Sequence, residues 1–164
     1  MEPVTIIVVQ TAEEMAEALR IRMRVFVEEQ GVWPDIEVDA YDRDPAHDGR
    51  VVHILARLDG TPVGTARLLL DAATATEDGA RLAKIGRVAV LAEHRRRHVG
   101  KALMAALHEE ARRRGFGGIA ISAQLQAVPF YERLGYVGDG PVYLEDGIDH
   151  RAMTLRFAVA PGDA

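Results

Sequence analysis

A strand, an arginine-rich turn and a helix follow one another in the middle of the chain and form a candidate anion-binding site. The strand covers residues 84–91, the turn holds three adjacent arginines at 95–97, and the helix covers residues 99–114. The first N–H groups of a helix have no partner within it and carry the positive end of its dipole, so a pyrophosphate can accept several hydrogen bonds there. Gly100 removes a side chain where the anion must approach the backbone. Arginines crowded at this end of a helix are unfavourable without an anion, which favours phosphate binding over a merely solvated loop.

A tyrosine further along the chain, Tyr131, could serve as a general acid. It lies in the segment FYERLGY at residues 130–136. A phenol held beside a departing group can protonate it, which contributes about 10²–10⁴-fold to a rate. The chain has no cysteine, so thiolate chemistry on the protein is excluded. On this segment alone, the tyrosine could instead be a core residue of a short helix.

Both segments resemble those of the Gcn5-related N-acetyltransferases (GNAT). That family has the pattern V-x-V-x-P-x-Y/H-R-G-x-G-x-G-x-x-L between its fourth strand and the following helix, and Phe-Tyr-x-x-x-Gly-Phe/Tyr further on. The first pattern is matched at Val88, Val90, His94, Arg95, Val99, Gly100 and Leu103, and the second at residues 130–136. Arg96 and His98 stand where the family often has glycines, and Ala92 replaces the usual proline.

The resemblance implies that acetyl-CoA is the co-substrate and that an acetyl group passes directly to an amine within a ternary complex. Backbone groups of the strand at 84–91 would bind the pantetheine arm, and an N–H of this strand could stabilise the oxyanion. Gln124 takes the place of the family's amide beside the arm, and Tyr131 that of the general acid. The implied cofactor-binding residues are Val88, Ala89, Val90, Arg95, Arg96, Arg97, His98, Val99, Gly100, Lys101, Gln124 and Tyr131.

The N-terminal half carries a further resemblance, to the ElaA-type branch of this family. The branch has a related Arg-x-x-Val-Phe-Val-x-Glu-Gln segment, here at residues 22–30, an acidic loop, and a Glu-Asp-Gly-Ile turn, here at residues 145–148. Acyl-homoserine lactone synthases share the fold and have Arg-x-x-Val-Phe, a Trp and Glu-x-Asp-x-Tyr-Asp in this region, as at Trp33 and residues 37–42 here. Acyl transfer of that kind is therefore an alternative, and a non-catalytic acyl-CoA-binding module is another.

Three acidic residues are candidates for the acceptor side. Glu28, Glu37 and Asp39 could attract a cationic amine or, through water, remove its proton. Each could equally lie in a solvated loop or form a salt bridge with Arg22 or Arg24.

Other charged residues favour structural roles. His53 and His150 lie in strands, where hydrogen-bonded packing is the expectation, and Arg67 and Arg87 are expected to anchor the acidic loop. No His, Asp and Glu spacing indicates a metal site.

The elements that must position these residues alternate between strand and helix. Thr11 and Glu14 form a capping-box signature that opens the first helix, and Asp59-Gly60 is a hairpin signal. The order β-α-β-β-β-α-β-α-β-β predicts an α/β (α+β) fold with a mixed sheet of about seven strands and helices on its faces. The resemblance adds a splay between the fourth and fifth strands. Expected strands cover 4–9, 51–58, 63–70, 84–91, 118–123, 136–142 and 150–159, with a further short helix at 127–134, an acidic loop at 35–49 and a polar connection at 71–79.

Length and charge narrow the possibilities further. The 164 residues fit one domain spanning 1–164, and the net charge of −5 argues against a nucleic-acid binder. Acid is concentrated at 28–48 and base at 95–97 and 112–114, which suggests a cationic partner on one side and an anionic one on the other. No apolar run is long enough for a membrane span, and the N-terminus lacks a secretory profile. We expect a cytoplasmic protein with a small-molecule or peptide amine substrate, no membrane partner and a possible homodimer.

Overall fold

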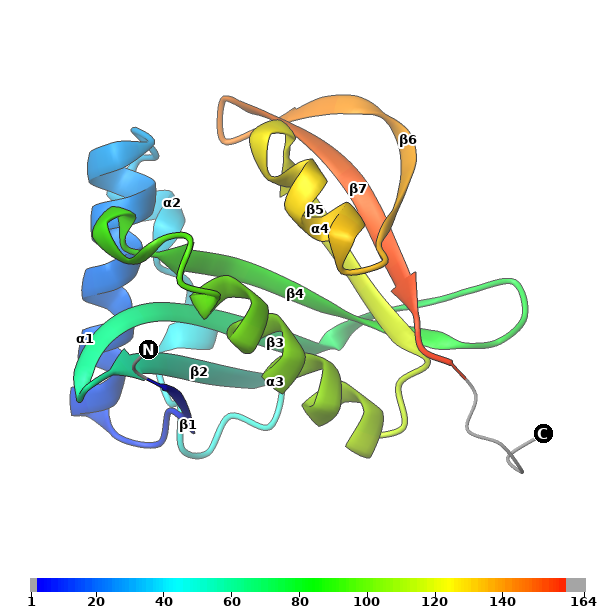
Figure 1. Ribbon diagram of the computed structural model, residues 1–164. Coiled ribbons are helices and arrows are strands. Elements are labelled where there is room, and N and C mark those ends of the chain that lie inside the picture. The colour runs from blue at the N-terminus through cyan, green and yellow to red at the C-terminus, as the bar shows by residue number, and fades with distance from the viewer. Residues whose placement is uncertain (1–2, 159–164) are drawn as a thin grey trace.

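The computed structural model describes residues 3–158 of the chain and contains one seven-stranded mixed sheet, in the order β1-β2-β3-β4-β5-β7-β6 (Figure 1). This confirms the expected sheet and its flanking helices. The strands are β1 (Val4–Val8), β2 (Val51–Leu58), β3 (Thr61–Ala75), β4 (Arg81–Val90), β5 (Gly118–Gln124), β6 (Val137–Glu145) and β7 (Ile148–Arg156). The helices are α1 (Ala12–Arg22), η1 (Met23–Glu29), α2 (Pro34–Glu37), η2 (Ala40–Asp42), η3 (Ala92–His94), α3 (Val99–Arg113), η4 (Leu125–Ala127) and α4 (Val128–Arg133).

Helices cover both faces of the sheet because successive residues of its central strands point to opposite sides. Ile54 of β2 packs in the larger core with Leu103 and Leu107 of α3. Its neighbour Leu55 packs in the second core with residues of α1 such as Ile21. Figure 1 shows α1 and α3 on either side of the sheet accordingly.

The first helix begins as its sequence predicts and then changes its winding. The Glu14 N–H donates to Thr11 Oγ1 and the Thr11 N–H donates to Glu14 Oε1, both at 3.1 Å, which completes the capping box. After Arg22 the helix continues as a π-helix, η1, up to Glu29. Such wider turns occur frequently at functional sites, and η1 forms one wall of the cleft described below.

The parallel strands β4 and β5 pair only at their beginnings and then diverge. Pairing joins Leu82, Ala83 and Lys84 to residues 118–120. At this junction a Cβ on Gly118 would overlap the carbonyl oxygen of Leu155 and crowd Leu82, so only glycine allows the close approach. Beyond it, β4 bulges against β3, because Arg87 and Val88 together face the single residue between Thr65 and Arg67.

Two connections contain more regular structure than the sequence indicates. The expected polar connection at 71–79 is wrong in part, because β3 continues to Ala75 and β4 begins at Arg81. The added arm of β3, residues 71–75, consists of small or polar side chains and is largely exposed, so backbone pairing forms it without the apolar alternation that marks a strand. The expected acidic loop at 35–49 holds the short helices α2 and η2.

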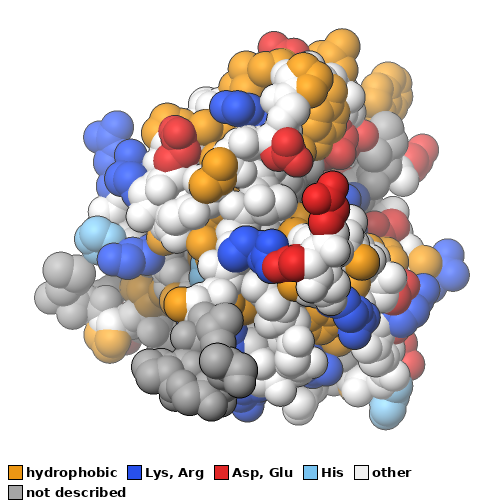
Figure 2. All heavy atoms as spheres, turned by 90° about the vertical axis from the view of Figure 1, so that its right-hand side faces the viewer, with side chains coloured by type: hydrophobic (Ala, Val, Ile, Leu, Met, Phe, Trp, Pro, Cys, Tyr) orange, Lys and Arg blue, Asp and Glu red, His pale blue; other side chains and the backbone are white. Residues whose placement is uncertain are grey.

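The C-terminal hairpin forms the far edge of the sheet. Its turn is Asp146-Gly147, both with positive φ (53° and 76°), as two-residue hairpin turns require. The strands therefore run to Glu145 and from Ile148 rather than to 142 and from 150. β6 is mostly exposed, with Val137 and Leu144 on the surface, where apolar side chains gather at the upper part of Figure 2. The turn of this hairpin borders the cleft described below.

A buried network of charges fixes the segment between η1 and β2 to the sheet. Arg22, 1% exposed, contacts Glu37 Oε1 and Asp42 Oδ1, each at 2.7 Å. Arg67 of β3 reaches Asp39 at 2.7 Å and Asp42 at 3.3 Å, and the Arg87 Nε donates to the Glu37 carbonyl at 3.2 Å. The expectation that Arg67 and Arg87 anchor the acidic segment is confirmed.

Loss of one buried partner of this network leaves its counter-charges unpaired. We expect Arg22→Gln to lower the free energy of unfolding by about 3–5 kcal/mol. The matched control is Arg24→Gln, which removes only the exposed pair with Glu93 and should cost less than about 1 kcal/mol. Urea denaturation at neutral pH measures both, and equal losses would contradict this account.

Candidate active site

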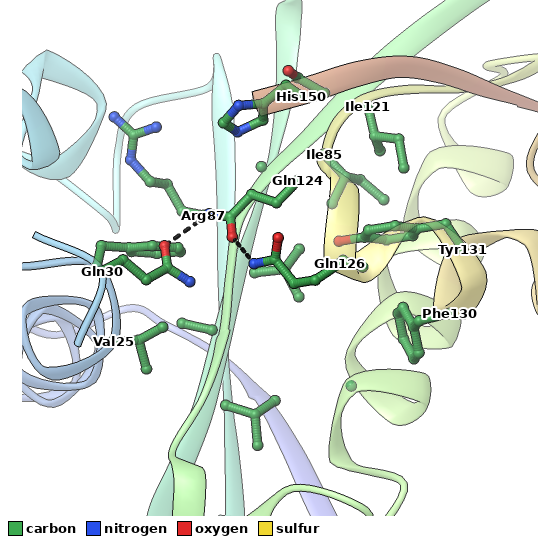
Figure 3. Close-up of a pocket in the computed structure, with 18 of the residues that line it drawn as sticks. Val25, Gln30, Ile85, Arg87, Ile121, Gln124, Gln126, Phe130, Tyr131 and His150 are labelled. Atoms are coloured by element: carbon green, nitrogen blue, oxygen red, sulfur yellow. Dashed lines mark hydrogen bonds between the residues drawn. The ribbon is translucent and has the colours of Figure 1, made fainter. Parts of the chain in front are cut away.

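A cleft of about 1170 Å³ opens where β4 and β5 diverge. One wall consists of β4 with η1 and neighbouring residues of β3, and the other of the end of β5 with η4 and α4 (Figure 3). The loop between η3 and α3 and the turn between β6 and β7 also border it. The residues expected to bind the cofactor lie along this cleft, with Arg97 outside its lining.

The cleft-facing edge of β4 carries backbone groups without a strand partner. On its other edge β4 pairs with β3 as far as Val90, but toward β5 the pairing ends at Lys84. Val88, Ala89 and Val90 line the cleft along this edge. The Val90 carbonyl accepts a hydrogen bond from Arg95 Nε at 3.0 Å. Backbone groups that lack strand partners seek other hydrogen bonds, so this edge can pair with an extended ligand that carries amides.

The turn before α3 adopts the backbone that the family pattern expects, although its residues differ. Arg96 and His98, which stand where glycines are frequent, have φ of 67° and 62°. This left-handed conformation favours glycine, and histidine is among the other residues that adopt it most readily. His98 occupies the N-cap position of α3 without a side-chain cap in the described structure. The first N–H groups of α3 therefore point from an uncapped helix end toward the cleft.

Arg95 is held by a residue that the sequence analysis left out. Its guanidinium contacts both carboxylate oxygens of Glu29, at 2.7 and 2.8 Å. Arg24 joins Glu93 in a similar way at 3.1 Å, so two ion pairs fasten the arginine turn to η1 across the mouth of the cleft. Arg95 therefore helps to hold the turn in place and also adds positive charge to it.

Gly100 is constrained by packing as well as by the space beside the helix end. A Cβ at this position would lie 3.2 Å from Phe130 Cζ. The Phe130 ring in turn packs edge-on against Tyr131, with centroids 5.0 Å apart. A side chain at position 100 would therefore disturb the candidate general acid as well as a bound phosphate.

Tyr131 projects from α4 into the cleft. Its ring is buried between Phe130 and Tyr136, and its hydroxyl points toward Gln126 and the open space (Figure 3). Burial raises the pKa of Tyr131 to about 12, so the phenol is protonated at neutral pH. Behind it, the Tyr136 hydroxyl and His108 Nε2 form a hydrogen bond of 2.7 Å.

Three glutamines bridge the two walls. Gln124 Nε2 donates to Gln30 Oε1 at 2.7 Å, and Gln126 Nε2 donates to Gln124 Oε1 (Figure 3). Gln30 follows η1, whereas Gln124 ends β5. Only Gln124 is expected from the sequence. The Val-Phe-Val-x-Glu-Gln segment contained Gln30, but nothing in one sequence indicated that it would face β5.

The three acidic candidates occupy different environments. Glu37 lines the cleft, and burial raises its pKa although Arg22 opposes the shift. Asp39 is partly buried, which raises its pKa, but the hydrogen bonds from Arg67 and Tyr41 and the charges of Arg67 and Arg87 together lower it. Glu28 is exposed and lies outside the cleft lining.

Further cleft residues escaped the sequence analysis as site candidates. Lys84 of β4 and Glu145 and Asp146 of the β6–β7 turn line the cleft. His150 also lines it, although its Nδ1 lies 2.7 Å from the Ile148 carbonyl, as expected for a packed histidine. His53 is buried, with Nε2 2.8 Å from the Tyr41 carbonyl, also as expected.

Comparisons with known proteins agree with this geometry. The pattern of the Acetyltransferase (GNAT) family matches residues 9–136. The chain belongs to this family. The uncharacterised N-acetyltransferase YjcF of Bacillus subtilis (strain 168) is 34% identical over 149 residues, which cover 90% of this chain and 96% of YjcF. Members of the GNAT family use acetyl-CoA, and acyl transfer is the chemistry that this membership supports.

Two solved structures share the whole fold. An acyl-CoA N-acyltransferase from Pseudomonas aeruginosa superposes with a TM-score of 0.73 at 31% identity, covering 94% of this GNAT chain and 99% of that one. Escherichia coli ElaA gives a TM-score of 0.74 at 27% identity, with coverage of 94% and 99%. The branch indicated by the sequence is thus among the structural neighbours.

Among residues 3–158, no helix is long and apolar enough to cross a membrane. The same residues contain no group of three or more His, Cys, Asp or Glu side chains placed to hold a metal ion.

The partly buried His108 makes stability depend on pH. Burial, with a contribution from Arg112, lowers its pKa from 6.5 to about 4. The unfolded chain therefore binds more protons between these values, so the free energy of unfolding should fall as the pH is lowered from 6.5 to 4, by about 1–2 kcal/mol because solvent screens part of the effect. His108→Gln should flatten this slope in urea titrations across that range. A slope as steep as that of the native protein would contradict the assignment.

Proposed function

We propose that the protein is an acyl-CoA-dependent N-acyltransferase that moves an acetyl group from acetyl-CoA to an amine. The observation that carries the proposal is the Tyr131 hydroxyl, which points into the cleft opposite the unpaired edge of β4. A thioester laid along that edge brings its sulfur toward the phenol. A binding module would have no need of a protonated phenol at this place.

The residues suit a direct transfer. The amine nitrogen attacks the thioester carbonyl, the new C–N bond forms as the C–S bond breaks, and the departing thiolate takes the Tyr131 proton. A backbone N–H of the strand segment from Val88 to Val90, which lines the cleft, would stabilise the developing oxyanion. The amide groups of the pantetheine arm pair with the same strand edge. The pyrophosphate of coenzyme A accepts hydrogen bonds from the N-terminus of α3.

Of the three acidic candidates, Glu37 fits best as the base that removes the amine proton, directly or through water. It lines the cleft and has a raised pKa. The lowered pKa of Asp39 makes it a weaker base, and Glu28 lies too far out on the surface to reach the amine.

Removal of the phenol should separate chemistry from binding. We expect Tyr131→Phe to lower kcat about 10²-fold or more while acetyl-CoA affinity, measured by calorimetry, stays nearly constant. Tyr136→Phe is the matched control, because it removes a neighbouring buried hydroxyl and its bond with His108, at a cost of about 1 kcal/mol in stability with kcat retained. Unchanged turnover in Tyr131→Phe would remove the phenol from the mechanism.

The transfer itself is tested by release of free CoA thiol with a panel of primary amines. We expect thiol release that depends on both the amine and the protein, together with thermal stabilisation by acetyl-CoA. Stabilisation by acetyl-CoA without thiol release from any amine would indicate an acyl-CoA-binding module instead.

A further inference from the structure

One wall of the cleft carries positive charge that acetyl transfer does not by itself require. Arg67, Lys84 and Arg87 line this wall on β3 and β4. Its acids are Glu37 and Glu29, and Glu29 is paired with Arg95. Strand register places Leu69 opposite Lys84 and Arg67 opposite Gly86. The intervening pair, Leu68 and Ile85, is in the larger core, so Arg67, Lys84 and Gly86 share the opposite face.

The bulge in β4 brings Arg87 to the same face. Its φ is 53°, a conformation that only a few per cent of residues other than glycine adopt. Its Nε lies 3.2 Å from the Glu37 carbonyl oxygen and 3.4 Å from Glu37 Oε1. Such strained residues persist where the surroundings hold them and cluster at binding sites.

Gly86 leaves an open space between Lys84 and Arg87. A Cβ built on this glycine meets no atom within 4 Å, and the residue lines the cleft. Its φ is outside the left-handed range, so its backbone does not require glycine. The space is therefore bounded by two cationic side chains on the strand and by bare backbone beneath.

Lys84 is the cation of this wall that remains uncompensated. In the buried network, the three arginines form ion pairs with three carboxylates. The arginines are Arg22, Arg67 and Arg87, and the carboxylates are those of Glu37, Asp39 and Asp42. Lys84 is exposed to the cleft and forms no ion pair with any of residues 3–158. The chain has 18 arginines and two lysines, and both lysines line the cleft.

The opposite side of this end carries carboxylates. Glu145 at the end of β6 and Asp146 of the β6–β7 turn line the cleft next to His150, while the cation Arg133 lines it from α4. In Figure 3, Arg87 and His150 lie beyond the glutamine bridge, on the two sides of the opening. A ligand that spans this end meets cations on one side and carboxylates on the other.

We propose that the acceptor is a small amino acid, with its carboxylate held over Gly86 between Lys84 and Arg87. Its amino group then faces the carboxylates and the thioester. The carboxylate gains charge-assisted hydrogen bonds, which are the stronger kind. This inference rests on the proposed acetyl transfer and adds the class of substrate.

The kinetic test compares free α-amino acids with their amides, which keep the amine and cap the acid. With acetyl-CoA saturating, we expect kcat/KM for the preferred amino acid to exceed that of its amide at least tenfold. The amine of the amide is the less basic one, so a larger fraction of it is unprotonated and able to react at neutral pH. This difference favours the amide, so a faster reaction of the amino acid is not explained by amine protonation. Equal rates, or faster reaction of the amides, would overturn it.

Two variants locate the carboxylate. Lys84→Gln should raise KM for the amino acid at least tenfold and leave KM for acetyl-CoA and the rate with the amide unchanged. Gly86→Val fills the space itself, so it should raise KM for the amino acid at least tenfold, raise that for the amide as well, and remove the preference for the acid. Arg20→Gln on the exposed side of α1 removes the same charge away from the cleft and should change neither. An acid preference that survives both cleft variants would overturn the assignment.

A binding measurement separates this inference from the transfer on which it rests. In the presence of CoA, we expect N-acetyl amino acids to bind at least tenfold more tightly than N-acetyl amino acid amides by calorimetry, with the difference lost in Lys84→Gln. If the acids bind in this way but no amine releases thiol, the anion site stands and the transfer fails. If thiol is released equally from acids and amides, the transfer stands and the amino acid acceptor is wrong.

Discussion

The divergence of β4 from β5 is the constraint on which the site depends. Parallel strands normally continue their hydrogen bonding, yet here pairing stops after Lys84. The edge of β4 beyond that point has donors and acceptors that must be satisfied by something other than a strand. Because α3 begins just after β4 and α4 just after β5, the same divergence sets an uncapped helix end and a buried phenol on the two sides of one opening. A single departure from regular pairing thus brings an unpaired strand edge, an uncapped helix end and a buried phenol to one cleft.

The buried charges explain how an open sheet remains rigid at this point. Charges that are desolvated gain stability only when their partners are well placed, and removal of one partner is costly. Arg22 meets this condition with two carboxylates at 2.7 Å. The network also fixes Glu37 at the cleft, where burial raises its pKa. One cluster therefore holds the segment between η1 and β2 and keeps the proposed base, Glu37, at the cleft.

Features with local causes could be predicted from the sequence, and those with distant partners could not. The capping box at Thr11 and the hairpin turn at Asp59-Gly60, with φ of 50° and 78°, depend on residues a few positions apart. The family pattern indicated residues 88–90 as cleft residues and marked Arg96 and His98 as departures from its glycines, but their left-handed backbone was not predicted. The pairing of Arg67 with Asp39, across 28 positions, was expected only as an anchor without a named partner. The Gln30–Gln124 contact, across 94 positions, and the open space at Gly86 depend on how distant strands come together.

The glutamine bridge bears on how the cleft accepts an extended ligand. Gln30, Gln124 and Gln126 satisfy one another across the opening. Polar groups that lose partners in a confined site are costly, whereas exchange of one amide partner for another is nearly neutral. The pantetheine arm of the proposed co-substrate carries amides of its own, so it can replace the Gln30–Gln124 bond with bonds of the same kind. The walls then separate without leaving a buried amide unpaired, and the energy of binding remains available to place the thioester against Tyr131.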